Sequence, residues 1–407
     1  MALTSNTKSS SSTKPTIEDN KGNILILGNS GVGKSTLINS ILGTEDALTG
    51  IGIVGTTDKL TVYDSDDPKY DCEGLHLRLI DTPGFEPSIA RKIKIISAVK
   101  KWSSDSAKEN KNPKINEIWF CVDGTAAKLF STTIKDLISA ISLWKTVPII
   151  VVITKSYGIP DRKKNIQMVQ DAFSDQKALK KNQKAIIPIV ASAYEINDSM
   201  YVAPDGIPEL IEKAIEILPE GKRAATHDVN AYNLQRRRIL SQTVVGTAVA
   251  GAVVVGFAPI PFADAALLGP IELTEVNAVA TVYGIMKDDR SKRFIDSIIQ
   301  VGTVSAAAKA AISALKAIPG INIAVGMLNA IIAGGIAAAI GEGSIYAFEQ
   351  IYLGKKSIED IDWVTKFMEN SMTNGFIEKM TEIIKQAASG ADKNKIAQMI
   401  ASAFSKQ

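Results

Sequence analysis

The stretch NILILGNSGVGKST, residues 23–36, constrains the fold of this chain more than any other feature. Its first part, NILILG, is an apolar run of the kind found in strands that are buried on both faces of a sheet. Three glycines follow, Gly28, Gly31 and Gly33, and they allow a tight turn in which successive N–H groups point at one anion. Apolar residues at helical spacing come next. A glycine-rich turn between a buried strand and a helix predicts a site for the phosphates of a nucleotide.

The polar residues of this turn suit the same ligand. Lys34 brings a full positive charge to the outer phosphates, and Ser35 supplies a hydroxyl for Mg²⁺. The helix that begins here points the positive end of its dipole at the phosphates.

Two later segments add groups that a phosphate and metal site needs. DTPG follows the apolar run LHLRLI and places Asp81 where it can hold the hydration shell of Mg²⁺. Gly84 in the same turn can offer its N–H to the terminal phosphate. Between the two sites, the glycine-rich segment GIVGTTDKL contains Thr56 and Thr57. A hydroxyl there can complete the metal shell when a third phosphate is present.

Strand-like and helical segments alternate through the first half of the chain. The expected strands are 23–28, 59–65, 76–84, 117–124, 148–155 and 185–192, and the last expected helix lies around 207–218. Such alternation predicts an α/β fold with a mainly parallel sheet flanked by helices on both faces. Ligands of such sheets bind at the carboxyl ends of the strands, so the loops at that edge matter most.

These segments resemble the motifs of Era-like P-loop GTPases of the translation-factor class. The matching strings are GNSGVGKSTLINSILG, GTTD, DTPG, TKSY and ASA, and the resemblance covers about residues 22–220. It implies GTP or GDP with Mg²⁺ as ligands, Thr57 (or Thr56) as the switch threonine, and catalytic roles for Lys34, Thr57 and Gly84. The implied magnesium ligands are Ser35, Thr57 and Asp81. The implied nucleotide-binding residues are Asn29, Ser30, Gly31, Val32, Gly33, Lys34, Ser35, Thr36, Asp81, Gly84, Thr154, Lys155, Ser192 and Ala193.

The chain departs from this family at the segment that reads the base. An Asp is expected two residues after Lys155, but Tyr157 stands there. Loss of a charged acceptor costs about 1.5–3 kcal/mol of recognition for each hydrogen bond. Lys155 can still cover the base plane, and Ser156, Ser192 or Asp161 can contact the base edge. Guanine is the expected base, and adenine stays open as the alternative.

A second departure concerns hydrolysis. Phe85 and Glu86 follow Gly84, where related switches carry a Gln that orients water. Because phosphoryl transfer depends mainly on positioning and charge neutralisation, slow GTP hydrolysis is expected. The missing group can come from another residue, a dimer partner or a bound cation. Arg91 is a candidate, and a solvated helix residue is its simpler interpretation.

The second half of the chain has a different composition. Residues 239–263 and 317–341 carry no charge and are rich in Ala, Gly, Val and Ile. Each is close to the length that spans a bilayer as a helix, and Arg236, Arg237 and Arg238 flank the first as interfacial basic residues would. Small residues also let soluble helices pack closely, and Pro259, Asp264, Glu272 and Glu275 argue against a simple span. Membrane-associated helices and a buried helical hairpin are therefore both retained.

Residues 230–350 resemble the YcjF-type helical domain of unknown function that accompanies Era-like GTPase domains. The shared features lie in GFAPIPFADAALLGPIELTEVNAVATVYG, and the resemblance implies an all-α, membrane-associated domain without chemistry of its own. After residue 355, amphipathic helices are expected on either side of TNG and SGADKN. The apolar positions from Phe376 to Ala387 predict one buried stripe.

Composition limits the remaining possibilities. The first 21 residues are rich in Ser, Thr and Lys, so a disordered tail without a signal peptide is expected. The expected parts are this tail, a GTPase domain over 22–220, an apolar helical domain over 221–354 and C-terminal helices over 355–407. Two cysteines and two histidines disfavour a disulfide framework and a histidine metal site.

Charge and motifs together predict a location and partners. A net charge of +3 shows no strong basic field for nucleic acid. We expect a cytoplasmic nucleotide switch, free or at the cytoplasmic face of a membrane, with a homodimer or another protein as partner. An Era-like RNA- or ribosome-associated assembly GTPase and an ATP-using scaffold are the alternatives.

Overall fold

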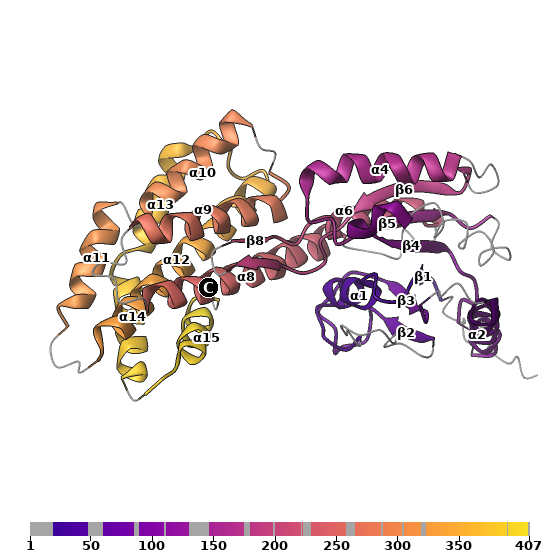
Figure 1. Ribbon diagram of the computed structural model, residues 1–407, viewed down its shortest axis with the longest axis horizontal. Coiled ribbons are helices and arrows are strands. Elements are labelled where there is room, and N and C mark those ends of the chain that lie inside the picture. Colours follow the sequence, from indigo (N-terminus) through magenta and orange to yellow (C-terminus); the bar gives the residue numbers. More distant parts are fainter. Residues whose placement is uncertain are drawn as a thin grey trace, which may run out of the picture.

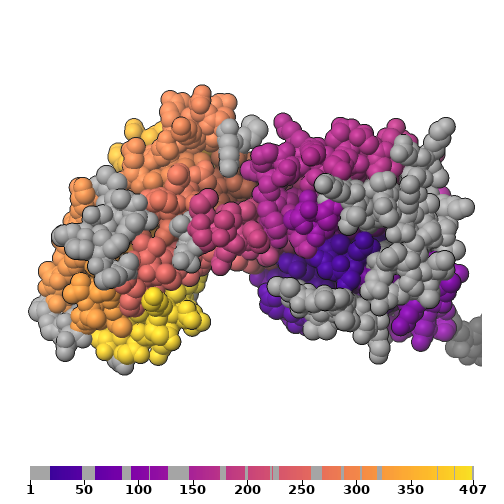
Figure 2. All heavy atoms as spheres, viewed as in Figure 1, coloured from indigo at the N-terminus to yellow at the C-terminus, as the bar shows by residue number. Residues whose placement is uncertain are grey.

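The protein consists of an α/β lobe and a helical lobe, which Figure 1 shows side by side in the computed structural model. Figure 2 shows the two lobes meeting through a narrower middle part. The structure describes residues 19–47, 60–84, 89–109, 111–129, 146–174, 180–197, 200–220, 222, 229–257, 265–285, 288–302, 305–318, 323–388 and 390–405. The α/β fold expected for the first half and the helical character expected for the second are confirmed.

A six-stranded sheet forms the centre of the α/β lobe, in the order β2-β3-β1-β4-β5-β6. All neighbouring strands are parallel except β2 and β3, which are antiparallel. The strands are β1 (Gly22–Gly28), β2 (Thr61–Asp64), β3 (Leu77–Asp81), β4 (Glu117–Asp123), β5 (Ile149–Thr154) and β6 (Gln183–Pro188). Each coincides with a strand expected from the sequence to within a few residues at its ends.

Helices cover both faces of this sheet because its central strands are apolar on both sides. They are α1 (Lys34–Leu42), α2 (Ile89–Lys108), α4 (Ile159–Ser174) and α6 (Ile207–Ile217), with a short 3₁₀ helix η1 (Gly124–Leu129). Leu25 and Leu27 of β1 face the core that includes residues of α2 and α4. Ile24 and Ile26 face the opposite core, which includes residues of α1 and α6. That second core continues without a break into the helical lobe.

A small hairpin after β6 is not among the elements expected from the sequence. It consists of β7 (Tyr194–Asn197) and β8 (Met200–Val202), paired antiparallel. The strands are three and four residues long and mostly exposed, so they lack the apolar run that identified the other strands. The hairpin lies against α9, where the two lobes meet.

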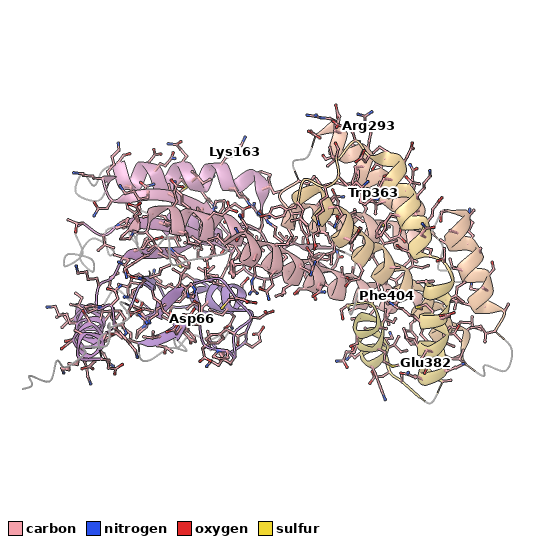
Figure 3. The ribbon with its side chains drawn as sticks, turned by 180° about the vertical axis from the view of Figure 1, so that it is seen from behind. Asp66, Lys163, Arg293, Trp363, Glu382 and Phe404 are labelled. Carbon is pink, nitrogen blue, oxygen red and sulfur yellow. The ribbon has the colours of Figure 1, made fainter. Side chains whose placement is uncertain are left out.

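The helical lobe is built around two long helices, α8 and α12, which pack along each other. Its helices are α8 (Val229–Gly256), α9 (Ala265–Val282), α10 (Asp289–Val301), α11 (Ala306–Lys316), α12 (Val325–Tyr352), α13 (Ile361–Ser371), α14 (Asn374–Ala387) and α15 (Lys393–Phe404). Glycines of α12 allow the close packing, since a Cβ at Gly334 would lie 2.7 Å from Cγ2 of Val253 on α8. The expected C-terminal stripe is confirmed, with Phe376, Met380 and Ile384 buried. Figure 3 labels Trp363 on α13 and Phe404 on α15 in this lobe.

Three segments are long and apolar enough to cross a membrane, judged by length and composition alone and among the described residues only. They are Val229–Gly256, Asp289–Lys316 and Val325–Tyr352. The second comprises α10 and α11, which are separate helices in the fold. In the folded chain, 56% of an 18-residue apolar stretch within the first segment is buried inside the protein, and 67% of the corresponding stretch within the third.

The arginine triplet, expected as a set of interfacial membrane residues, makes tertiary contacts in this fold, and its membrane role stays a prediction. Arg236 and Arg237 are 1% and 5% exposed. Arg236 donates to the backbone oxygen of Asp71, and Arg237 donates to that of Val282. Arg238 forms an ion pair with Glu349 at 2.6 Å. Each of the three arginines therefore has a hydrogen-bond or ion-pair partner from a distant part of the chain.

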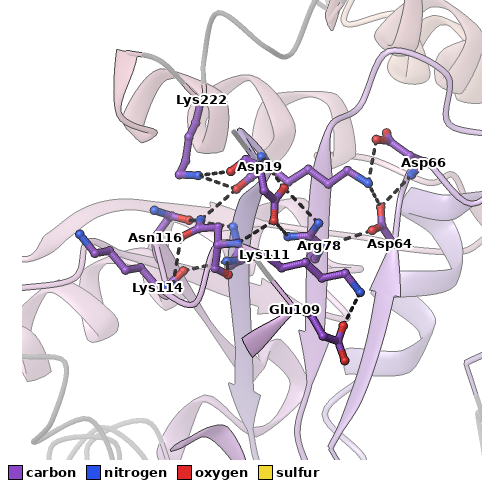
Figure 4. A network of polar contacts seen from close by, with 12 residues as sticks. Asp19, Asp64, Asp66, Arg78, Glu109, Lys111, Lys114, Asn116 and Lys222 are labelled. Atoms are coloured by element: carbon purple, nitrogen blue, oxygen red, sulfur yellow. Dashed lines mark hydrogen bonds and ion pairs between the residues drawn. The ribbon is translucent and has the colours of Figure 1, made fainter. Parts of the chain in front are cut away.

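The end of the expected tail is ordered by charge pairing. Arg78 of β3 donates to Asp19 at 2.6 Å, and the backbone N–H of Asn112 donates to the same carboxylate at 2.6 Å. Lys21 pairs with Asp66 at 2.8 Å. Figure 4 shows these contacts near the residues where β1, β3 and β4 begin. Residues 1–18 lie outside the described part of the chain.

Candidate nucleotide site

The phosphate loop leaves β1 at the middle of the sheet and ends where α1 begins. Gly31 and Gly33 have φ of +74° and +98°, a left-handed conformation that favours glycine. Gly33 is the residue before the first turn of α1 and carries no side chain that could cap its N–H groups. The free N–H groups of this helix start therefore point into the loop, as an anion site requires.

Lys34 lies folded back over the loop. Its Nζ donates to the backbone oxygens of Gly28 and Asn29, both at 3.1 Å. The side chain is buried, and burial lowers the pKa of Lys34, while the nearby carboxylate of Asp81 acts in the opposite direction. The amino group of Lys34 thus lies beside the loop, and phosphate oxygens could replace the two carbonyls that now accept its hydrogen bonds.

The DTPG turn contacts the phosphate loop directly. Asp81 is buried at the end of β3, where its position in the register is opposite Ile26 of β1. Thr82 donates through its hydroxyl to the backbone oxygen of Ile26 at 2.8 Å. A Cβ at Gly84 would lie 2.6 Å from the Cα of Ser30, so no side chain fits there. The fold brings together the two segments expected to hold phosphate and metal.

The end of β5 is fastened to the other side of the loop. Thr154 donates through its hydroxyl to the backbone oxygens of Val32 and Val122, the second at 3.0 Å. Lys155 has a φ of +52°, and its Nζ donates to the backbone oxygen of Gly31 at 2.8 Å. It also pairs with Asp123 at 2.7 Å. The stem of Lys155 is thereby held beside the loop, as a residue that covers a base would be.

Tyr157, which stands where an Asp was expected, stacks on another tyrosine. Its ring lies 4.2 Å from that of Tyr194, centroid to centroid, with 18° between the planes. Tyr194 begins β7 immediately after Ser192 and Ala193, so the two segments expected to contact a base meet at this pair. Sequence reasoning missed Tyr194, although its place directly after ASA was a usable signal.

Several expected site residues cannot be placed. Thr56, Thr57, Phe85 and Glu86 lie outside the described residues. Arg91 lies in α2, but its side chain is likewise outside the description. The role expected for Thr57 at the metal and in catalysis therefore stays a prediction.

The residues at the loop fit Mg²⁺ bound together with a nucleotide. Within the described ranges, no group of three or more His, Cys, Asp or Glu side chains could hold a metal by itself. The loop instead offers the hydroxyl of Ser35 and the carboxylate of Asp81, and Mg²⁺ commonly combines a few such oxygen ligands with water and substrate phosphates.

Comparisons with known proteins agree with this geometry. Residues 23–155 match a protein-family model described as 50S ribosome-binding GTPase. No curated protein matches the chain. Solved structures similar to it include Toc33 from Arabidopsis thaliana, with 17% identity over 52% of this chain and 84% of that chain and a TM-score of 0.34. A probable GTP-binding protein engB shares 21% identity over 48% and 98%, with a TM-score of 0.33.

A variant of Era from Aquifex aeolicus shares 21% identity over 62% of this chain and 70% of that chain, with a TM-score of 0.32. The assignment of the helical lobe to the YcjF-type domain stays a prediction. The matched range 23–155 begins in β1, includes the phosphate loop and the DTPG turn, and ends at Lys155. The α/β lobe contains a P-loop GTPase domain, and the protein is accordingly an enzyme that hydrolyses nucleoside triphosphates.

Proposed function

We propose that this protein is a Mg²⁺-dependent GTP-binding switch that hydrolyses GTP slowly and passes its nucleotide state to the helical lobe. The family match and the phosphate loop support the first part. The inferred slow rate rests on Phe85, which follows Gly84 where related switches place a Gln. The coupling rests on α8, the helix that connects the two lobes.

The residues of the loop have separate roles in this proposal. Backbone N–H groups from Gly31 to Thr36 bind the phosphates, and Lys34 exchanges its loop carbonyls for phosphate oxygens. Ser35 and Asp81 would hold Mg²⁺, directly or through water, and the ion would neutralise charge on the outer phosphates. Gly84 approaches the terminal phosphate through its N–H and senses its loss.

One observation supports the coupling: a side chain of α8 is hydrogen-bonded to α1, the helix that starts at the phosphate loop. Tyr232 of α8 donates through its hydroxyl to the backbone oxygen of Ile41, the penultimate residue of α1, at 3.0 Å. The guanidinium of Arg236, one turn further on, lies against Gly43, where an added Cβ would be 3.0 Å from its Nη1. Both side chains are buried. A movement of α1 on nucleotide exchange would therefore shift α8 or weaken these contacts.

Hydrogen exchange measured by mass spectrometry tests this coupling. The protein is loaded with GDP or with a non-hydrolysable GTP analogue, both with Mg²⁺, and exchange is followed in α8 and α12. We expect protection in these helices to differ between the two states. The Tyr232→Phe variant, which loses only the bond to Ile41, should show a smaller difference. Identical exchange in both states of the unaltered protein would contradict the switch, because a ligand shifts an equilibrium only through differential affinity.

Membrane association is a second candidate function, favoured by the three apolar segments. Because α8 and α12 cover each other in the fold, binding to a bilayer would require the lobe to open. Flotation with liposomes containing anionic lipid, in the GDP state and in the GTP-analogue state, tests this. Flotation in one state only would support a nucleotide-controlled membrane contact, and absence of flotation in both would remove it.

Ribosome or RNA binding is the alternative suggested by the description of the matched family. RNA-binding appendages are usually basic, whereas the helical lobe buries Arg236 and Arg237 and pairs Arg238 with Glu349. We therefore expect little retention on RNA at physiological salt. Filter binding to ribosomal RNA over a range of salt concentrations separates this alternative from the switch.

A further inference from the structure

The segment that would read the base has lost its carboxylate at the expected position, and an aromatic ring stands there. The ring of Tyr157 is held by its stack on Tyr194. The backbone N–H of Tyr157 also donates to the oxygen of Lys155 at 2.8 Å, in a tight turn. A ring fixed in this way offers a flat surface to a base but no carboxylate that could accept from two donors of guanine at once.

A carboxylate is nevertheless present beside this ring. Asp161, in the first turn of α4, lines the same open cavity of 740 Å³ as Lys155 and Tyr157. It is exposed. Lys164 of the same helix also lines this cavity. The cavity therefore combines the stem of Lys155, the ring of Tyr157 and the carboxylate of Asp161.

The carboxylate of Asp161 lies against the backbone of the turn before α4. A Cβ added on Gly158 would lie 2.7 Å from Oδ2 of Asp161. The backbone N–H of Asp161 donates to the oxygen of Gly158 at 3.1 Å, which fixes the start of the helix relative to the turn.

We propose that Asp161 supplies the carboxylate that selects guanine, and that Tyr157, supported by Tyr194, forms the wall on which the base stacks. The inference rests on the proposed function, because it assumes a guanine nucleotide at this loop. A carboxylate accepts from the N1–H and the 2-amino group of guanine, whereas adenine presents an acceptor at N1. Stacking on a ring tolerates every base, so selectivity comes from Asp161 and affinity is shared by both residues.

Nucleotide affinities of matched variants test the assignment. Kd is measured by competition with a fluorescent GDP analogue for GDP, ADP and xanthosine diphosphate. In Asp161→Asn the amide replaces one acceptor by a donor, which suits the 2-carbonyl of xanthine. We expect the affinity of this variant for GDP to fall about 10- to 100-fold, as loss of a charged hydrogen bond predicts. Its affinity for xanthosine diphosphate should rise above that for GDP. Asp171→Asn, with the same change on the exposed face of α4, is the control and should bind like the unaltered protein.

The stacking role has its own readout. Tyr157→Ala should lower the affinities for GDP and ADP by the same factor, about 5- to 100-fold. Tyr157→Phe should leave both affinities unchanged. Unequal losses in Tyr157→Ala would mean that the tyrosine itself reads the base and would overturn this division of roles.

The two levels of the hypothesis fail differently. If the unaltered protein binds GDP but Asp161→Asn changes neither the GDP nor the xanthosine affinity, this inference is overturned and the proposed function stands. If the unaltered protein prefers ADP or binds no guanine nucleotide, the proposed function fails, and the inference fails with it.

Discussion

At the scale of single residues, the contact of Gly84 with the phosphate loop makes the clearest prediction for catalysis. A Cβ at this position would lie 2.6 Å from the Cα of Ser30, so Gly84→Ala must move the DTPG turn or the loop. Displacements of about 1 Å at a reacting centre can cost about 100-fold in rate, and we expect a loss of that order in GTP hydrolysis. The measurement is single-turnover phosphate release. Gly246→Ala is the control and should keep the rate, since a Cβ there meets no atom of the described residues within 4 Å. An unchanged rate in Gly84→Ala would contradict the role.

A second residue, Arg236, makes the clearest prediction for stability. Its buried guanidinium donates to the backbone oxygen of Asp71 and lies over the ring of Tyr232. Arg236→Ala leaves that oxygen without this donor and removes packing, so we expect a loss of about 2–4 kcal/mol in the free energy of unfolding. Arg290, exposed and paired with the exposed Glu359, is the comparison, since Arg290→Ala should cost less than about 1 kcal/mol. Urea denaturation of both variants checks this, and equal costs would show that the lobes do not depend on the contact.

At the scale of elements, α9 predicts a dependence of stability on pH. Glu272 and Glu275 of this helix are 2% and 0% exposed. Among the described residues, neither carboxylate oxygen of Glu275 has a hydrogen-bond partner, and Oε1 of Glu272 also lacks one. Burial raises the pKa of Glu272 from 4.5 to about 7 and raises the pKa of Glu275 well above 4.5. Both carboxyls are therefore protonated more readily in the folded chain than in the unfolded chain.

The sign of the effect follows from these shifts. An acid whose pKa is raised by folding stabilises the fold most at a pH below its unfolded value, and this stability is lost as the pH rises toward the folded value. Between pH 5 and pH 7.5 we expect the free energy of unfolding to fall by about 1–3 kcal/mol through Glu272. Glu272→Gln should reduce this dependence and leave the part due to Glu275, whereas Glu369→Gln, at an exposed site on α13, should leave it intact. Urea denaturation at both pH values is the test, and equal slopes in the two variants would count against the buried carboxyl.

The elements also show how far the sequence predicts the structure. The four central strands of the main sheet were predictable because strands buried on both faces are continuous apolar runs, and the phosphate loop was predictable from its glycines and Lys34. The hairpin β7–β8 was not, because its short exposed strands bury little apolar surface. The tertiary contacts of Arg236–Arg238 were not predictable for a related reason. Partners such as Asp71 and Glu349 lie more than a hundred residues away in the chain, and local patterns do not report such contacts.

At the scale of the whole molecule, α8 belongs to both lobes. Its first turns contact α1 through Tyr232, and its later turns pack along α12 in the core of the helical lobe. The apolar core is continuous across this connection. Lobes that share a buried helix should unfold together, unlike domains joined by an exposed linker.

Calorimetry with and without nucleotide tests this last prediction. We expect one cooperative transition for the full chain, and Mg·GDP at about 100 times its Kd should add about 2.7 kcal/mol to the free energy of unfolding by mass action. Because the helical lobe unfolds with the α/β lobe, it should share this gain although it binds no nucleotide. Arg236→Ala should separate the transition into two, with only the α/β lobe responding to Mg·GDP. Two transitions in the unaltered protein, one of them insensitive to nucleotide, would mean that α8 joins the lobes without coupling them, and the proposed switch would then lack its physical connection.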